Sequence, residues 1–274
     1  MSARGRRFPV VLERAVHAAG PAKADARAGQ RVQQPQRPLR DASEHAARET
    51  VPLGLGLDSQ SVRSRMVESL RAHGARCEPV LAAMASVPRH VFVDTALAAQ
   101  AYEDTALPIG LGQTISKPSV VARMLALLYE GRDAARTGSL GRVLEIGSGC
   151  GYQAALLSLL AQQVISVERL RPLYERARDN LALMRRDNLR LVYGDGRLGH
   201  APNAPYDAIV CAAGGDDVPQ AWLDQLAVGG RLLAPTRVGP QKWQVLITVD
   251  RTGDGWTRRD HESVHFVPLR SGIA

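Results

Sequence analysis

The chain has 274 residues with a formal net charge of +8; 45% of its residues are hydrophobic and 23% are charged. This balance is typical of one globular domain with an appendage, and no apolar stretch reaches the roughly 18–20 residues of a membrane span. The cysteines Cys77, Cys150 and Cys211 form no C-x-x-C pair, which argues against a disulfide framework or a zinc site and favours a reduced, cytoplasmic protein.

The first 57 residues form a basic extension. Residues 1–50 carry ten Lys or Arg against five Asp or Glu, so about five of the eight excess positive charges lie there. Stretches such as "AGQRVQQPQRPLR" predict a disordered or loosely helical segment. The rest of the chain is only mildly basic and has no basic stripe interleaved with aromatic residues. We therefore expect neither nucleic acid nor membrane as the main partner.

Helices and a loop are expected over residues 58–130, before the main sheet. In "LDSQSVRSRMVESLRAHG", Asp58 or Ser59 offers a helix cap and Gly74 ends the helix. Its apolar residues share one face: Val62, Met66, Val67 and Leu70. The segments "PVLAAMASV" and "VVARMLALL" repeat this helical pattern, and the segment between them is rich in loop residues.

From residue 142 onward, short apolar runs alternate with helical patterns. In order they are "RVLEI", "YQAALLSLLA", "VISVE", "PLYERARDNLALM", "LRLVYGD", "YDAIVCAA", "VPQAWLDQL" and "GRLLAP". The alternation predicts an α/β fold in which residues 140–274 form a doubly wound, mostly parallel, Rossmann-like sheet. "WQVLITVD", the turn "RTGDG" and "ESVHFVPL" predict two closing antiparallel strands.

The segment "VLEIGSGCGYQ" carries Gly147, Gly149 and Gly151 between the first strand and a helix. Glycines at such a turn let backbone amides approach a ligand. The dinucleotide fingerprint G-x-G-x-x-G needs a glycine where Tyr152 stands. Glu145, just before the turn, would repel a pyrophosphate and attract the ammonium and sulfonium of S-adenosylmethionine. Charge therefore favours S-adenosylmethionine as the cofactor.

Two further acids end the next two strands. Glu168 lies 21 residues after Gly147, where the hydroxyls of a ribose diol can donate hydrogen bonds to it. Asp195 lies in "GDG" at the end of the third strand, where it can accept a hydrogen bond from an adenine amino group. Acids at three successive strand ends predict one cofactor site.

Seven segments resemble, in order, the blocks of the protein-L-isoaspartate (D-aspartate) O-methyltransferase family, from about residue 60 to 270. They are "PRHVFV", "ALPIGLGQTISKPSVVARML", "VLEIGSGCGYQ", "SVER", "GDGRLGHAPNAPYDAIVCAA", "LAVGGRLLAP" and "VHFVPL". The resemblance implies a class I methyltransferase fold. It also implies an enzyme that uses S-adenosylmethionine to methylate the α-carboxylate of L-isoaspartyl, and of D-aspartyl, residues in damaged peptides and proteins, which starts their repair through a succinimide. We expect such an enzyme to be a monomer.

The resemblance also assigns roles to single residues. Ser116 would supply the active-site hydroxyl, and Thr114 and Ile115 would shape the substrate-binding loop with it. The implied cofactor contacts are Gly147, Gly149, Glu168, Asp195 and Gly196. A carboxylate is ionised at neutral pH and a sulfonium is a good leaving group, so the reaction needs alignment more than a general base. From the residues alone, "GLGQTIS" also fits a simple turn built on Gly110 and Gly112.

The chain departs from the family pattern in three places. Asp216 and Asp217 follow the fourth strand, where the family has small or apolar residues, and negative charge facing the site would weaken the binding of an anionic substrate. "APTRVG" makes the segment after the fifth strand longer than is usual in the family, and the 57-residue extension has no counterpart in the family. Two alternatives stay open. One is a class I methyltransferase acting on RNA or a small molecule, and the other is a cofactor-binding or nucleic-acid-binding protein that has lost catalysis.

The segment "HESVH" satisfies the zinc motif H-E-x-x-H. That motif binds zinc only when a helix places both histidines on one face. The alternation in "SVHFVPL" indicates a strand instead, on which His261 and His265 would lie about 13 Å apart. We therefore expect no metal site.

Overall fold

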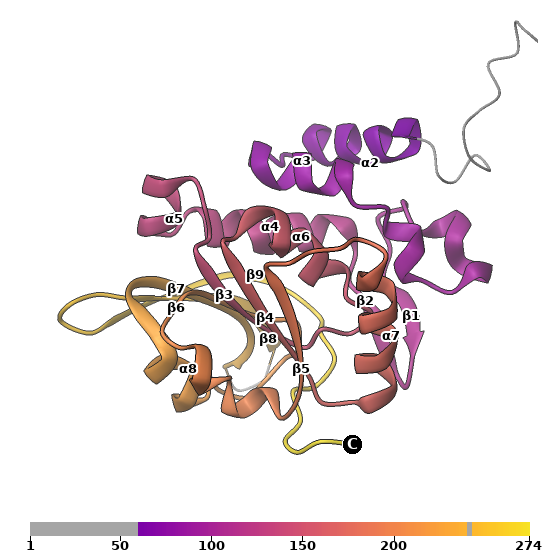
Figure 1. Ribbon diagram of the computed structural model, residues 1–274. Helices are drawn as coiled ribbons and strands as arrows, with labels where there is room; N and C mark the ends of the chain where they lie inside the picture. The colour runs from indigo at the N-terminus through magenta and orange to yellow at the C-terminus, as the bar shows by residue number, and fades with distance from the viewer. Residues whose placement is uncertain (1–59, 240–242) are drawn as a thin grey trace, which may run out of the picture. The chain divides into compact units, whose positions relative to one another are not determined.

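The computed structural model describes residues 60–239 and 243–274. The expected extension and the expected helix caps Asp58 and Ser59 lie outside these residues. Within the described part, the chain forms a seven-stranded sheet with helices on both faces and a separate two-stranded hairpin (Figure 1).

The seven-stranded sheet has the order β5-β4-β3-β6-β7-β8-β9. Its strands are β3 Arg142–Ile146, β4 Gln163–Glu168, β5 Leu189–Tyr193, β6 Tyr206–Cys211, β7 Leu226–Val238, β8 Trp243–Arg251 and β9 Trp256–Ser263. Neighbouring strands from β5 to β7 are parallel, and the two pairs that follow are antiparallel. This confirms the predicted class I methyltransferase fold. Because the strand order reverses between β3 and β6, the loops leaving these strands open a crevice at the sheet's carboxyl edge.

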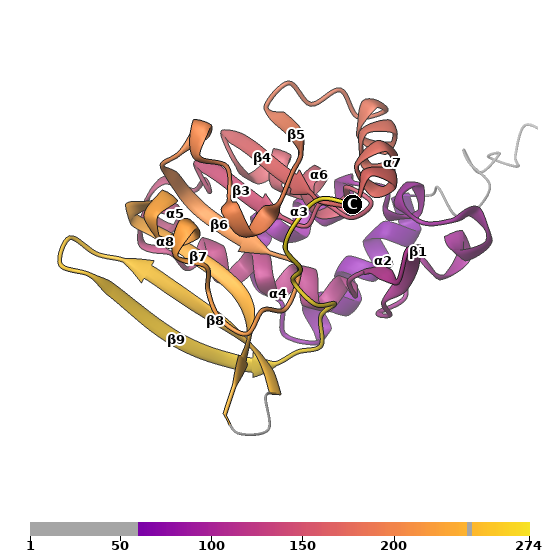
Figure 2. The same cartoon turned by 90° about the horizontal axis from the view of Figure 1, so that it is seen from below.

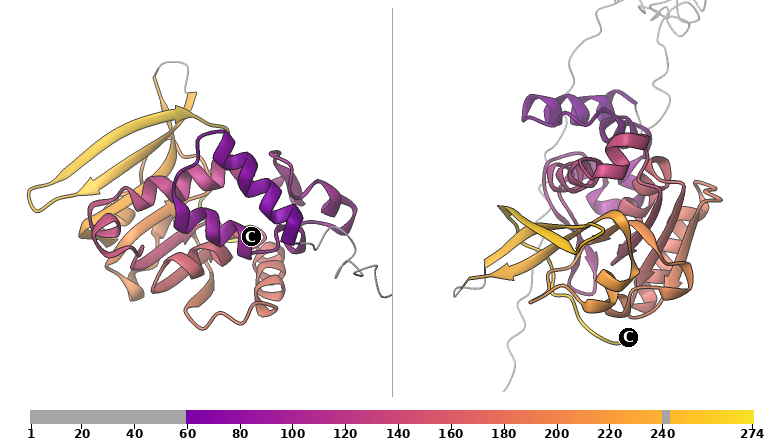
Figure 3. Two further views of the ribbon diagram at one scale, coloured as in Figure 1. Left: turned by 90° about the horizontal axis from the view of Figure 1, so that it is seen from above. Right: turned by 90° about the vertical axis from the view of Figure 1, so that its left-hand side faces the viewer.

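Helices cover both faces of the sheet (Figures 1 and 3). They are α2 Gln60–Ala72, α3 Glu78–Ser86, α4 Pro118–Tyr129, α5 Arg132–Thr137, α6 Tyr152–Leu160, α7 Arg171–Ala182 and α8 Gln220–Gln225. Buried residues of α2, α3, α4, α6 and α7 join one apolar cluster with one face of the sheet. Trp222 of α8 packs in a second cluster on the other face. None of the helices in the described residues is long and apolar enough to cross a lipid bilayer.

The predicted helices before the sheet are confirmed, with buried faces where the apolar pattern placed them. Met66, Val67 and Leu70 of α2 are buried, and the chain turns at Gly74, whose φ is 101°. Two short 3-10 helices follow α3, at Arg89–Phe92 and Thr95–Gln100. They lead the chain back toward the carboxyl edge of the sheet.

A hairpin occupies the segment that the sequence pattern left as a loop. It consists of β1 Leu107–Gly110 and β2 Gln113–Ile115, paired antiparallel. Leu111 and Gly112 connect the strands with φ angles of 53° and 68°, as in the type I′ turns that favour Asn-Gly. Because leucine rarely adopts positive φ, the residues gave little sign of this turn.

The closing antiparallel pair is confirmed, but its second strand lies earlier than expected. Arg251 pairs with Trp256 directly after the turn, so β9 uses "WTRRDHES" and ends at Ser263 (Figure 2). The prediction of a strand over "ESVHFVPL" was therefore wrong for most of that segment. The chain beyond β9 crosses to the loop after β6, where the N–H of Gly214 donates to the carbonyl of Val267 at 2.7 Å. This crossing brings residues 267–270 to the crevice.

Candidate functional site

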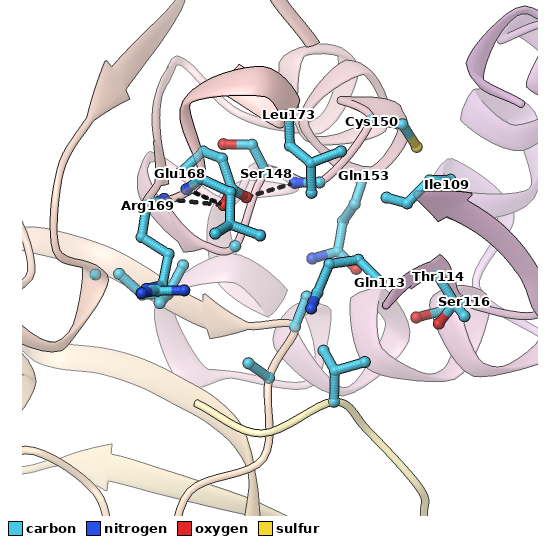
Figure 4. A pocket seen from close by; sticks show the side chains of 18 of the residues that line it. Ile109, Gln113, Thr114, Ser116, Ser148, Cys150, Gln153, Glu168, Arg169 and Leu173 are labelled. Atoms are coloured by element: carbon cyan, nitrogen blue, oxygen red, sulfur yellow. Dashed lines mark hydrogen bonds between the residues drawn. The ribbon is translucent and has the colours of Figure 1, made fainter. Parts of the chain in front are cut away.

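A cavity opens at the carboxyl edge of the sheet, above the ends of β3, β4 and β6. Its wall combines the glycine turn, the end of β4, the β1–β2 hairpin and the segment after β9. Figure 4 shows Glu168 at one end of this cavity and Thr114 and Ser116 at the other, with Gln113 and Gln153 between them. The fold thus brings together residues from both halves of the described chain.

The glycine turn is left-handed at all three glycines. Gly147, Gly149 and Gly151 have φ angles of 89°, 56° and 93°. Gly147 and Gly149 line the cavity. Gly151 lies behind the wall as the N-cap of α6, where an added Cβ would lie 3.1 Å from the side chain of Leu181 on α7. Position 151 therefore needs a glycine because α6 and α7 pack closely there, and Gly151 does not face the cavity.

Glu168 holds the turn from the end of β4. One carboxylate oxygen accepts the N–H of Gly149 at 2.9 Å, and the other accepts the N–H groups of Arg169 and Leu170, each at 2.9 Å (Figure 4). The side chain is only 5% exposed and lines the cavity. A carboxylate offers about four acceptor positions. These three bonds leave capacity for a hydroxyl donated by a ligand.

Glu145 is placed differently from the expectation. It is fully buried and does not line the cavity, because its side chain points from β3 toward α6. One carboxyl oxygen accepts a 2.5 Å hydrogen bond from the hydroxyl of Ser166, which lies 2.5 Å from that of Ser148 on the cavity wall. Burial raises the pKa of Glu145 to about 8. A pKa raised in this way favours the neutral carboxyl at neutral pH and so weakens its attraction for a sulfonium.

Asp195 also lies behind the wall. One carboxylate oxygen accepts the N–H of Arg197 at 2.9 Å, and the other accepts the N–H of Gly272 at 2.6 Å. The carboxylate thus anchors the segment after β9, and it does not line the cavity as expected. Gly196, the next residue, does line it, and an added Cβ there would lie 2.6 Å from Ile146.

The end of β2 forms the opposite wall. Thr114, Ile115 and Ser116 all line the cavity, as the family resemblance implied, with Ile115 buried and Ser116 half-buried. Thr114 and Ser116 also line a second cavity, which lies against the start of β8 and the segment after β9. Ser116, the residue that follows β2, therefore borders both cavities.

The second cavity joins apolar and basic side chains. Apart from Thr114 and Ser116, its wall includes Lys117, Val120, Arg237, Trp243, Val264 and Phe266. Arg237 forms an ion pair of 2.8 Å with Asp216, whose side chain is 73% exposed. Asp217 accepts the N–H of the adjacent Val218. Neither acid lines either cavity, so the two acids that departed from the family pattern do not face the site.

The sequence analysis missed many wall residues of the first cavity, among them three from the hairpin and from α6. Gln113, Ile109 and Gln153 line the first cavity. Gln113 and Ile109 belong to the hairpin, which the loop-like composition concealed. Gln153 follows the glycine turn in the first helical turn of α6, and its position there was the only available signal. The side-chain nitrogen of Gln153 is buried and has no hydrogen-bond partner among the described residues.

Among the described residues that line the first cavity, none is an activated nucleophile. Burial raises the pKa of Cys150, which lines the wall, so its thiol stays protonated. His261, from the rejected zinc motif, lies in β9 within 3.0 Å of the Thr248 hydroxyl. The wall offers hydroxyls, amides, one carboxylate and the arginines Arg169 and Arg270, which suit binding and alignment.

Comparison with a family model and with known proteins gives consistent matches. The family described as protein-L-isoaspartate(D-aspartate) O-methyltransferase matches residues 60–274. A protein-L-isoaspartate O-methyltransferase of Methylibium petroleiphilum is 63% identical over 239 residues, which cover 87% of this chain and 88% of that protein. One from Burkholderia mallei is 54% identical over 277 residues, with 97% of this chain and 84% of the relative covered.

Solved structures agree with the fold. A structure of a protein-L-isoaspartate O-methyltransferase has a TM-score of 0.68 and 27% identity, and the match covers 77% of this chain and 67% of that one. The Plasmodium falciparum beta-aspartate methyltransferase, in complex with S-adenosyl-L-homocysteine, has a TM-score of 0.64 and 24% identity, covering 76% of this chain and 98% of that one. At this identity the second likeness concerns the fold alone.

Proposed function

The chain belongs to the protein-L-isoaspartate(D-aspartate) O-methyltransferase family, and from that premise we propose that it methylates isoaspartyl residues. The acceptor would be the α-carboxylate of L-isoaspartyl, and of D-aspartyl, residues in damaged proteins, and the donor would be S-adenosylmethionine. Methylation of that carboxylate starts the repair of the damaged residue.

The observation that carries this proposal is the meeting of two cavities at Ser116. The first cavity has the glycine turn and Glu168, which suit a cofactor. The second opens on the other side of the same strand end and includes Trp243 and Phe266, which suit a peptide chain. Four residues line both: Thr114, Ser116, Ala212 and Val267. A peptide carboxylate in the second cavity could therefore approach a group held in the first cavity beside Ser116.

The wall of the first cavity fits S-adenosylmethionine. Glu168 keeps acceptor capacity for a ribose hydroxyl, and the turn at Gly147 and Gly149 admits a ligand because it has no Cβ. An added Cβ at Gly149 would lie 3.2 Å from Ile109, so the close approach of hairpin and turn depends on glycine. When bound, this cofactor supplies a methyl group activated by a positively charged sulfur.

Three residues of the expected cofactor set are proposed to act from behind the wall. Glu145 would hold Ser148 in place through Ser166. Asp195 would hold the segment that contains Gly272 against the cavity. Gly151 would allow α6 and α7 to pack beneath the turn.

The chemistry needs alignment more than proton transfer. The substrate carboxylate is ionised at neutral pH, so no residue must remove a proton before the reaction. We propose that the hydroxyl of Ser116 donates a hydrogen bond to this carboxylate and orients one oxygen toward the cofactor cavity. Thr114 and Ile115 would fix the strand end that carries Ser116. Excluding water from the site and fixing the direction in which the carboxylate approaches the methyl group lower the barrier to methyl transfer chiefly by preorganisation.

We further propose that the enzyme works in the cytoplasm as a monomer, with isoaspartyl peptides and proteins as its partners. Cys77, Cys150 and Cys211 are free thiols, which suits a reducing compartment.

The test is methyl transfer from labelled S-adenosylmethionine to an isoaspartyl peptide and to its aspartyl twin of identical sequence. We expect label on the isoaspartyl peptide only, in a base-labile ester. Equal labelling of both peptides, or none of either, would overturn the proposed function.

A further inference from the structure

Arg89 is among the largest fully buried side chains of the described residues, with 0% of its surface exposed. It opens the 3-10 helix Arg89–Phe92, which lies between α3 and the hairpin. Arginine is almost never fully buried unless a carboxylate pairs with it. Its burial beside the site therefore needs an explanation.

All bonds of the guanidinium go to neutral groups. Its Nε donates to the carbonyl of Ala101 at 2.7 Å, and its Nη2 donates to the carbonyl of Ser116 at 2.7 Å. The guanidinium carbon lies 4.8 Å from the centre of the Tyr152 ring. The third nitrogen, Nη1, is buried without a hydrogen-bond partner. None of the ion pairs within residues 60–239 and 243–274 includes Arg89.

Two consequences follow from this arrangement. The first is geometric, because the bond to the Ser116 carbonyl fixes the backbone of the residue whose hydroxyl we assign to the substrate. The second is electrostatic. Burial lowers the pKa of Arg89, but a guanidinium stays protonated at neutral pH. A positive charge that forms no ion pair, and on which Asp104 acts only through space, thus lies behind Ser116 in a region of low dielectric where its field is weakly screened.

We propose that Arg89 is a positioning residue of the methyl-transfer site, which fixes Ser116 through its carbonyl and whose unpaired charge favours an anionic group at the Ser116 hydroxyl. This inference rests on the proposed function, since the anionic group is the α-carboxylate of the isoaspartyl substrate. Arg89 itself lines neither cavity and contacts the wall from behind, through Ser116 and Tyr152.

A purely structural role is the competing explanation. Arg89 donates hydrogen bonds to the carbonyls of Ala101 and Ser116, and these two bonds could serve only to stabilise the folded chain. The two explanations predict different values of the peptide KM. Bonds that serve only stability leave the KM of the folded enzyme for peptide unchanged, whereas a charge that faces the substrate carboxylate affects that KM and not the affinity for the cofactor.

The test compares Arg89→Gln and Arg89→Lys with Arg63→Gln as the matched control. Arg63 of α2 also donates from Nε to a backbone carbonyl, that of Ala85 at 2.9 Å, but it lines neither cavity. For each variant we would measure kcat and KM for an isoaspartyl peptide, the Kd of S-adenosylhomocysteine by calorimetry, and the melting temperature. The wild-type assay comes first, since a wild-type enzyme that does not methylate the peptide refutes the proposed function and not the role of Arg89.

We expect Arg89→Gln to raise the peptide KM about tenfold, equivalent to about 1.4 kcal/mol, with the Kd of S-adenosylhomocysteine within about twofold of wild type. Arg89→Lys keeps the charge, so its KM should return to within about threefold of wild type, while kcat stays lower because one of the two carbonyl bonds is lost. Arg63→Gln should change the melting temperature alone. A peptide KM that is unchanged in Arg89→Gln, or no better in Arg89→Lys, overturns the inference.

Two further measurements complete the test. The first covers the case in which Arg89→Gln does not fold, and the second asks whether Arg89 acts on kcat through Ser116. If Arg89→Gln does not fold, Arg89→Lys decides alone: lowered kcat with a near-normal KM supports the inference, and an unchanged kcat overturns it. If Arg89 acts through Ser116, its loss should lower kcat less in a Ser116→Ala background than in the wild type. Fully additive effects on kcat would contradict that coupling.

Discussion

The carboxylate of Glu168 accepts a hydrogen bond of 2.9 Å from the N–H of Gly149, so the acid that ends β4 holds the glycine turn that follows β3. The same carboxylate accepts two further backbone N–H groups at the start of α7. Glu168 therefore shapes the wall of the cofactor cavity and also offers acceptor capacity to a ligand. A change at this residue should affect stability and cofactor affinity together.

We predict that Glu168→Ala weakens binding of S-adenosylhomocysteine by about 1–3 kcal/mol, because a ribose hydroxyl loses its acceptor and buried N–H groups are left unpaired. Calorimetry measures this loss directly. Glu175→Gln is the control, since Glu175 forms an exposed pair with Arg171 on α7 and lines neither cavity. Equal affinities of Glu168→Ala and wild type would show that the ribose assignment is wrong.

We predict that Ser116→Ala lowers kcat for an isoaspartyl peptide about 10- to 100-fold, because a hydrogen bond to a charged group contributes about 1.5–3 kcal/mol. Affinity for S-adenosylhomocysteine should stay within about twofold, since the rest of the first cavity is intact. Ser86→Ala is the control, because that hydroxyl donates to the Ala82 carbonyl on the exposed end of α3. A Ser116→Ala enzyme as fast as the wild type would remove the proposed role.

The fold was largely predictable because most of the strands and helices after residue 142, β9 excepted, have a local sequence pattern that predicts them. A buried parallel strand reads as a short apolar run, and a glycine turn marks the step from β3 to α6. The β1–β2 hairpin was not predictable in this way. Its turn places Leu111 at positive φ, where a leucine is strained, so tertiary contacts and not local preference determine the conformation.

The site was predictable at residues whose position follows from the turn and strand ends, such as Gly147 and Glu168. The orientation of Glu145 was not, because whether a strand residue points to the crevice or to the helix layer depends on packing. Asp195 lies behind the wall of the first cavity for a different reason. Its carboxylate is taken up by the N–H of Gly272, which lies 77 residues away in sequence and whose position no local pattern reveals.

We predict that Asp216→Asn lowers the peptide KM about two- to fivefold, because it releases Arg237 at the second cavity to interact with an anionic substrate. The effect is small because the pair is partly exposed, and such pairs are worth about 0.2–1 kcal/mol. Arg237→Gln should raise KM, and added salt should reduce both effects. Steady-state kinetics at two ionic strengths measures them.

Asp217→Asn is the matched control for this prediction. Its carboxylate accepts the N–H of the adjacent Val218, and it lines neither cavity. The peptide KM of this variant should equal that of the wild type. If Asp216→Asn and Asp217→Asn shift KM alike, net charge and not the release of Arg237 is the cause.

We predict that Glu145→Gln stabilises the protein at alkaline pH. Burial raises the pKa of Glu145 to about 8 in the folded chain, whereas an exposed glutamate has a pKa of about 4.3. Between these values the folded state keeps a proton that the unfolded state has lost, so the contribution of Glu145 to stability is complete below about pH 4 and falls until about pH 8. Glutamine is neutral throughout and keeps an oxygen that accepts from Ser166.

The free energies of unfolding of wild type and Glu145→Gln, measured in urea at pH 5, 7 and 9, check this prediction. The variant should gain about 1–3 kcal/mol on the wild type between pH 5 and pH 9, because only the wild type must either bury a charge or take up a proton. Glu175→Gln removes an exposed carboxylate and should show no such divergence. A difference in free energy of unfolding that stays constant from pH 5 to pH 9 would contradict this prediction, because it would mean that Glu145 is ionised in the folded protein. The hydrogen bond from the Ser166 hydroxyl would then be made to a carboxylate behind the cavity.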